Sequence, residues 1–105
     1  MKGSDSMQTL EYFGVTSTPR GCCIGTIIVK IDHEFISGTI HFFEKNGEYR
    51  GELDSRGNLK ISGVLPTLKD NVTFQGIGKI TFNALHLELK AEEYLYEINA
   101  TNKNI

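Results

Sequence analysis

The sequence contains no tryptophan, only two prolines and only three alanines among its 105 residues. No apolar run approaches the roughly 20 residues that a membrane-spanning helix needs. Neither sign of charge dominates, because 11 lysines and arginines stand against 13 aspartates and glutamates. A surface built for nucleic acid or for an anionic membrane would need a basic excess. We therefore expect neither nucleic acid nor a membrane as a partner.

The two cysteines, Cys22 and Cys23, are adjacent, and a disulfide between neighbours in the chain is strained. We expect them to be buried as small apolar residues, with a metal or redox role as the alternative. Residues 1–8 are polar and lack the apolar segment of a signal peptide. The sequence therefore predicts a cytoplasmic protein with a disordered N-terminus over residues 1–8.

Residue types that favour β-strands are abundant. Isoleucine, valine, phenylalanine, tyrosine and threonine account for 34 of the 105 residues, whereas alanine, the best helix former, is scarce. Eleven glycines add many possible turns and strand kinks. This composition predicts an all-β protein.

Glycines recur at a nearly constant spacing, at positions 25, 38, 51, 63 and 76. Several share the pattern apolar, any, glycine, any, apolar, as in Tyr49-Arg-Gly51-Glu-Leu53 and Ile61-Ser-Gly63-Val-Leu65. Residues two apart lie on one face of a strand, so these glycines share the inward face with large apolar residues. A spacing of about 13 residues corresponds to one strand and one tight turn, which is typical of an antiparallel meander.

Alternation of apolar and polar residues then defines eight strands. We expect them near 9–16, 24–31, 35–43, 47–54, 58–65, 72–82, 85–91 and 94–100. Asn46-Gly47 and Glu92-Glu93 mark two of the turns. Residues 9–100 would form one domain, an up-and-down β-barrel of about eight strands, with residues 101–105 as a disordered tail. A β-sandwich of the same strands is the alternative.

In outline this meander resembles the lipocalin-like calycin architecture, in which an eight-stranded barrel encloses a ligand. The Gly-x-Trp signature near the first strand is missing, because the chain has no tryptophan. Our leading hypothesis for the function is a non-enzymatic module that binds a small molecule in the lumen of the barrel.

The inward face supports a hypothesis about that ligand. It is almost wholly apolar, so the lumen would hold a small apolar or aromatic molecule, without a cofactor. The glycines would leave room for the ligand, and tyrosine hydroxyls would orient it. The predicted binding residues are Tyr49, Tyr96, Phe42, Phe74, Phe82, Gly38 and Gly51. The alternative is a solid barrel, in which the glycines serve curvature and the tyrosines are core residues.

The outward face offers a second hypothesis, from a different functional class. Four apolar residues point outward on the second and third strands and would form a patch that makes a homodimer, namely Ile24, Ile28, Phe35 and Phe43. In the rival interpretation the N-terminal segment, with Leu10, Tyr12, Phe13 and Val15, folds over this patch.

Catalytic and metal signals are weak. His33, His41 and His86 show neither His-x-His nor His-x-x-x-His spacing, so we expect surface histidines and no metal site. No carboxylate falls on the inward face, which favours a protein that is not an enzyme. A cysteine–histidine pair that meets in space is left as an open alternative.

Overall fold

In a computed structural model, residues 7–18, 21–67 and 70–103 are described, and their regular structure is all β. Eight strands follow one another: β1 (Met7–Thr18), β2 (Gly21–Asp32), β3 (Phe35–Phe42), β4 (Lys45–Leu53), β5 (Asn58–Leu65), β6 (Val72–Ile80), β7 (Ala84–Ala91) and β8 (Tyr94–Asn102). No helix in the described residues has the length and apolar character needed to cross a membrane.

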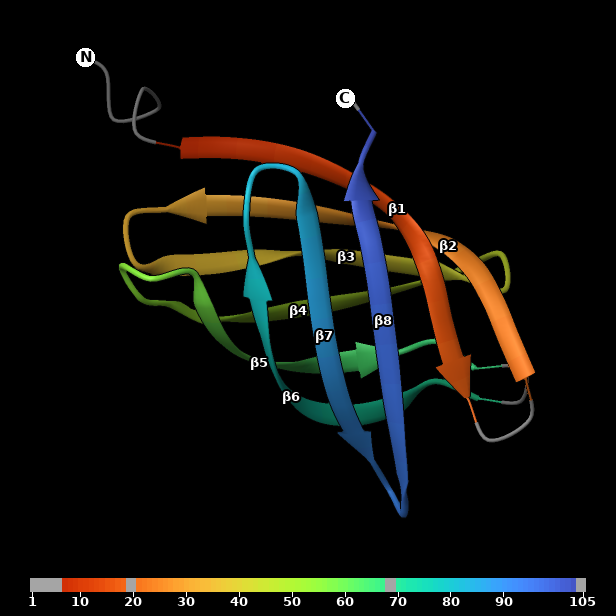
Figure 1. Cartoon of the computed structure of the whole chain (residues 1–105). Helices are drawn as coiled ribbons and strands as arrows, with labels where there is room; N and C mark the ends of the chain where they lie inside the picture. The colour runs from red at the N-terminus through yellow and green to blue at the C-terminus, as the bar shows by residue number, and fades with distance from the viewer. Residues whose placement is uncertain (1–6, 19–20, 68–69, 104–105) are drawn as a thin grey trace.

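The strands form a closed antiparallel barrel in sequence order, and Figure 1 follows the chain from β1 in red round to β8 in blue. Closure comes from β1 pairing with β8, where Tyr12 lies opposite Asn102 and Ser17 opposite Glu97. The predicted up-and-down barrel is therefore confirmed, and the β-sandwich alternative is wrong. β1 begins at Met7 and β8 ends at Asn102, so the barrel extends slightly beyond 9–100. Residues 1–6 and 104–105 lie outside the described residues.

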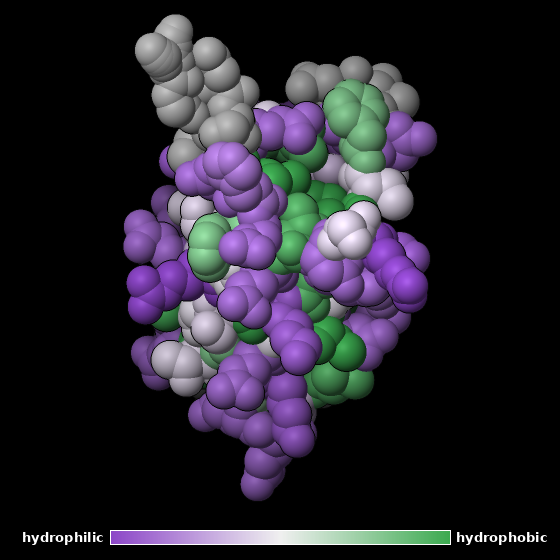
Figure 2. Space-filling model, turned by 90° about the vertical axis from the view of Figure 1, so that its left-hand side faces the viewer, coloured by the Kyte–Doolittle hydropathy of each residue, from purple (hydrophilic) through white to green (hydrophobic). Residues whose placement is uncertain are grey.

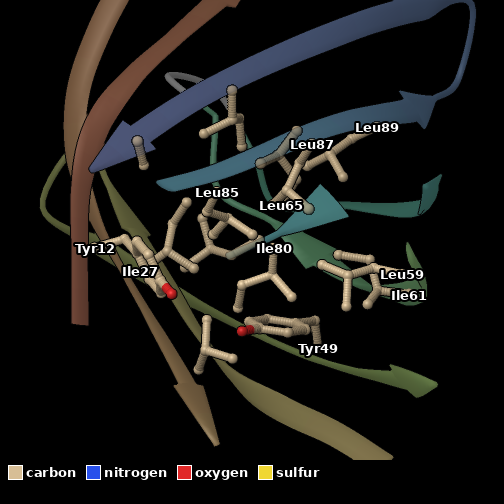
Figure 3. Packing of buried hydrophobic residues seen from close by; sticks show 14 of the residues in the cluster. Tyr12, Ile27, Tyr49, Leu59, Ile61, Leu65, Ile80, Leu85, Leu87 and Leu89 are labelled. Carbon is tan, nitrogen blue, oxygen red and sulfur yellow. The ribbon is translucent and has the colours of Figure 1, made fainter. Parts of the chain in front are cut away.

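Alternate residues of every strand point into one continuous core (Figure 3). The fully buried members include Tyr12, Ile27, Val29, Ile40, Phe42, Leu87, Leu89 and Ile98. Each fully buried leucine or isoleucine contributes roughly 1.5–3 kcal/mol relative to an exposed position. One face of each strand is buried in this way, as the alternation predicted.

The recurring glycines face large side chains on the next strand. Gly38 lies opposite Tyr49, Gly51 opposite Ile61, and Gly63 opposite Phe74. A Cβ atom on Gly38 would overlap the carbonyl oxygen of Ile28, and one on Gly63 would lie 2.8 Å from the Cβ of Tyr49. These positions therefore lack room for a side chain, because the neighbouring strand already occupies the space.

Candidate functional site

Tyr49 on β4 is part of the buried core of the barrel. The residue lies between two glycines, Gly38 on β3 and Gly63 on β5, and its side chain extends past Gly38 toward β2. Tyr49 is only 5% exposed, and its hydroxyl donates a 2.8 Å hydrogen bond to the backbone carbonyl of Ile28, two strands away. Burial, and secondarily the nearby Tyr12, raise the pKa of the Tyr49 phenol. This hydroxyl is committed to the protein's own backbone.

A second buried tyrosine behaves in the same way. Tyr12 on β1 is 0% exposed, and its hydroxyl donates to the carbonyl oxygen of Thr81 at 2.7 Å. The same backbone segment accepts a 2.8 Å bond at Phe82 O from the side-chain amide of the buried Asn102. The two side chains thus fix the connection between β6 and β7 against the strands that close the barrel. From the sequence, Tyr12 is considered only as one of several residues of an N-terminal segment that would cover a surface patch.

The other predicted lumen residues divide into three groups. Phe42 and Phe74 are buried core residues, at 1% and 3% exposure. Tyr96 is half-buried against the core and meets Tyr94 edge to face, with ring centroids 6.5 Å apart. Gly38 and Gly51 are half-buried in the barrel wall.

Phe82 does not point into the barrel, so this predicted binding residue is wrong: its side chain is 59% exposed. Strand β6 ends at Ile80, and the backbone N–H of Thr81 already donates to Ala84 O in the turn that follows. The alternation that seemed to continue through Phe82 therefore stops two residues earlier.

Several hollows in the described part of the chain are lined mostly by outward-facing side chains. One of them runs over β2–β7 and is lined by outward side chains such as Lys30, Glu48, Arg50, Gln75 and Lys90, with Tyr49 at its floor. Charged and amide side chains rim this hollow, so it does not have the character of an apolar ligand pocket. Figure 2 shows one face of the molecule, where apolar side chains are interrupted by polar ones.

The four predicted interface residues do not form one continuous patch. Ile24 and Phe35 are exposed, at 62% and 56%, whereas Ile28 and Phe43 are half-buried. Phe35 pairs with Asp32, eight residues from Ile24 along β2, or roughly 26 Å at strand spacing. Phe43 lies in the turn after β3 and packs against the core.

A different group of apolar residues gathers beside Ile24. Val15 on β1 is its direct partner, and Phe13 lies two residues away on the same face, at 39% and 47% exposure. The N-terminal segment therefore does not cover the patch: Leu10 and Tyr12 enter the core, while Phe13 and Val15 extend the patch sideways. We call the surrounding surface the uncharged face; it comprises Phe13, Val15, Ser17, Cys22, Ile24, Thr26, Asn99 and Thr101.

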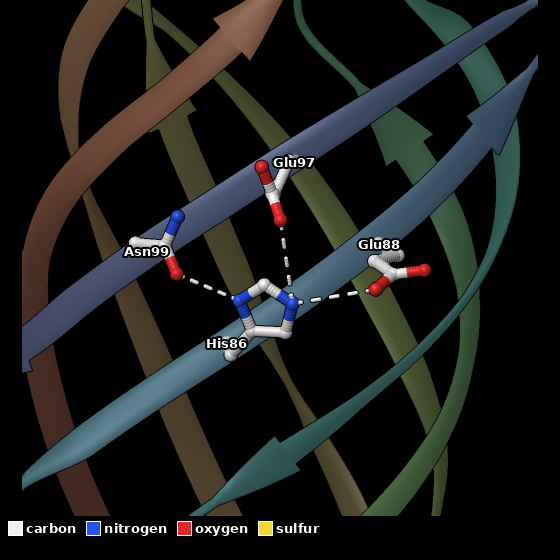
Figure 4. Close-up of polar contacts among 4 residues, drawn as sticks. All are labelled: His86, Glu88, Glu97 and Asn99. Carbon is white, nitrogen blue, oxygen red and sulfur yellow. Dashed lines mark hydrogen bonds and ion pairs between the residues drawn. The ribbon is translucent and has the colours of Figure 1, made fainter.

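A polar cluster lies on the outer side of β7 and β8, next to the uncharged face (Figure 4). His86 Nδ1 lies 2.7 Å from Asn99 Oδ1, and its Nε2 lies 3.4 Å from Glu88 Oε2 and 3.7 Å from Glu97 Oε2. The hydrogen bond to Asn99, supported by the two carboxylates, raises the pKa of His86. The sequence predicts His86 to be an isolated surface histidine and does not bring these four residues together.

The signal for this cluster was nevertheless present. A two-residue turn at Glu92-Glu93 makes Ala91 the partner of Tyr94, and counting back along the hairpin places Glu88 opposite Glu97 and His86 opposite Asn99. Counting register outward from the predicted turn would have found all four residues. A search for histidine spacing along the chain could not find them.

The cysteines do not form a disulfide: Cys22 is exposed and Cys23 half-buried, and both are free. The predicted burial therefore fails for Cys22, whose side chain points to the outer face. On the opposite face of the neighbouring strand, Thr16 is 3% exposed and its hydroxyl has no hydrogen-bond partner.

Comparison with family models, with curated proteins and with solved structures finds no match to this chain.

Proposed function

We propose that this protein is a non-enzymatic interaction module, a solid β-barrel that acts through its outer surface and forms a homodimer through the uncharged face. The observation that carries the proposal is the pairing of Phe13, Val15 and Ile24, three exposed apolar side chains on adjacent strands. Exposed apolar residues that occur singly are ordinary, but neighbouring ones mark interfaces.

The filled interior supports an external function over a lumen. Both buried tyrosine hydroxyls donate to backbone carbonyls, at 2.7 and 2.8 Å, so neither is free to orient a ligand. The glycines that would leave room for a ligand have no free space at their Cβ positions, because backbone atoms of a neighbouring strand already lie there. A small molecule would have to displace packed side chains, which costs more than filling a preformed pocket.

The distribution of charge supports the location of the interface. The outer side of β1 carries Phe13, Val15 and Ser17, and the direct partners of Phe13 and Val15 on β2 and β8 are threonine, isoleucine and asparagine. Charged groups begin only at the margins, with the Glu11–Lys103 ion pair at one end and Glu97 at the other. Depletion of charge at the centre with a charged rim is typical of protein interfaces.

A two-fold axis suits this face because the same patch then serves both subunits. Isologous dimers are the commonest assemblies, and each subunit buries about 800 Å² in a standard interface. The patch would supply the apolar centre of such an interface, and the threonine and asparagine side chains would supply its hydrogen bonds.

The test is the molecular mass in solution, measured by light scattering and by native mass spectrometry on the full chain. Ile24→Lys places a charge in the patch and should convert the dimer into a monomer. Ile77→Lys is the matched control, since Ile77 is 57% exposed on β6, away from the uncharged face. It should leave the dimer intact.

Two outcomes would contradict the proposal. A wild-type protein that stays monomeric up to roughly 100 μM would remove the homodimer. Native spectra that release a bound small molecule from the wild-type protein would restore the lumen as the functional site.

A further inference from the structure

We infer that His86, Glu88 and Glu97 form a binding site for a divalent first-row transition-metal ion, with Zn²⁺ as the best-matched representative. The side chains offer one imidazole nitrogen and two carboxylate oxygens, and these three atoms all lie within 4.8 Å of one another. The site does not require a second subunit, because all three residues come from one hairpin of one chain, and only Asn99, which contacts His86, is shared with the uncharged face.

The hairpin places the ligands in a fixed arrangement. Glu88 on β7 and Glu97 on β8 are direct partners, and His86 lies two residues before Glu88 on the same face. Side chains of direct cross-strand partners start about 4.5–5.5 Å apart at Cβ, so both carboxylates reach one point without distortion of the backbone. The site is therefore built by strand register rather than by loops.

The distances suit a shared ion better than a hydrogen bond. His86 Nε2 lies 3.4 Å from Glu88 Oε2 and 3.7 Å from Glu97 Oε2, beyond the usual 2.7–3.2 Å range of N–H···O bonds. Ligand atoms about 2.1 Å from a tetrahedral zinc ion lie about 3.4 Å from one another. The two nitrogen–oxygen separations are close to the edges of that tetrahedron, and the two carboxylate oxygens lie within 4.8 Å of each other.

Asn99 orients the histidine as a ligand. Its side-chain oxygen lies 2.7 Å from His86 Nδ1, which donates its N–H to this acceptor. The neutral ring then keeps its lone pair on Nε2, the nitrogen that faces the two carboxylates (Figure 4). An oxygen acceptor on the far nitrogen is the usual arrangement for a metal-bound histidine, since it fixes both tautomer and ring orientation.

The facing carboxylates of Glu88 and Glu97 also favour a cation between them. Like charges directly opposite on a sheet destabilise it, and Glu88 faces Glu97 in this way. In the described part of the chain, the ion pairs of both carboxylates are made with His86 alone. Lys79 lies opposite His86 on β6, and Lys90 follows two residues after Glu88, so cationic side chains flank the cluster. A divalent ion would neutralise the two carboxylates while the imidazole stayed neutral.

The donor set selects the class of metal. Imidazole suits zinc, copper, nickel and iron, whereas sites for magnesium and calcium are made of oxygen ligands alone. The side chains of His86, Glu88 and Glu97 are 40%, 46% and 52% exposed, so water can reach the ion. Three protein ligands with water at the fourth position complete a tetrahedral zinc site.

The test is titration of the full-length chain with Zn²⁺, followed by calorimetry and by the nitrogen-15 shifts of the histidine rings. His86→Ala and Glu97→Gln should each weaken zinc binding at least tenfold, and Asn99→Ala should weaken it by about 10–100-fold. His41→Ala is the matched control, since His41 Nδ1 makes the same 2.7 Å contact, with Asn46 Oδ1. It should bind zinc like the wild type, and only the His86 ring should shift.

Thiols are a second possible zinc ligand, so the series is repeated with both Cys22 and Cys23 replaced by serine. One zinc ion per chain in that background, lost in His86→Ala, supports the site. Zinc binding that disappears with the cysteines overturns it. Equal affinity in His86→Ala and the wild type, or no binding by the wild type, also overturns it.

Discussion

Replacement of Tyr49 by alanine gives the sharpest test of whether the barrel is solid. The side chain is 5% exposed, lies between Gly38 and Gly63, and donates a 2.8 Å hydrogen bond to Ile28 O. Truncation of a buried aromatic residue costs about 3–5 kcal/mol, and the lost hydrogen bond about 1 kcal/mol more. The glycines cannot fill the space, so we expect a loss of about 4–6 kcal/mol in the free energy of unfolding.

The assay is chemical and thermal unfolding followed by circular dichroism. A loss of this size is a large part of the roughly 5–15 kcal/mol by which a typical domain is stable. It corresponds to a fall of roughly 20 °C in melting temperature. Tyr49→Phe, which removes only the hydroxyl, should cost about 1–3 kcal/mol and keeps the comparison informative if the alanine variant fails to fold. Tyr94→Ala is the matched control: at 46% exposure it should cost under about 1 kcal/mol.

A ligand experiment completes this test. Tyr49 belongs to the apolar core, so the space left by Tyr49→Ala should bind benzene or phenol, which raises the melting temperature of the variant. The wild-type protein should show no such rise, because the ring of Tyr49 already occupies the space. A Tyr49→Ala variant that loses less than about 1 kcal/mol, or a wild type that phenol stabilises equally, would refute the solid barrel.

Two further predictions follow from burial. The pKa of Tyr49 is higher in the folded protein than in the unfolded chain, where it is about 10. The contribution of this phenol to stability is therefore complete below about pH 10 and is lost as the pH rises above it. Stability should consequently fall more steeply with alkaline pH for the wild type than for Tyr49→Phe. Circular dichroism against pH measures the difference, and identical profiles would contradict the assignment. Phe74→Ala should lower the free energy of unfolding by about 3–5 kcal/mol in denaturant titrations, whereas Phe82→Ala should change it by no more than about 0.5 kcal/mol. Comparable losses for the two variants would contradict the inward placement of Phe74 and the outward placement of Phe82.

The fold could be predicted because its signals are local. Glycine spacing, alternation and turn residues each act over a few positions, and together they defined eight strands with ends close to those observed. The failure at Phe82 has a physical reason, since Thr81 and Ala84 close a turn that alternation alone does not reveal. Asn102 continues β8 opposite Tyr12, a pairing made only when the barrel closes.

The candidate sites depend on register, which the sequence states less directly. The uncharged face exists because β1 lies between β2 and β8, so Val15 meets both Ile24 and Asn99. No pattern within β1 predicts its neighbour at the end of the chain. The cluster of His86, Glu88 and Glu97 is intermediate, because a tight turn at Glu92-Glu93 determines the pairing across one hairpin.

The glycine period itself argues against a lumen once the register is known. In β4, β5 and β6 each repeated glycine follows, two residues later, a large side chain, namely Tyr49, Ile61 or Phe74. Each of these lies opposite the glycine of the preceding strand. The repeat thus places a glycine on one strand opposite a large side chain on the next. The glycine pattern, which could leave room for a ligand, is therefore explained by packing of the core. This arrangement supports the proposed function on the outer surface, where the uncharged face and the cluster on β7 and β8 lie side by side.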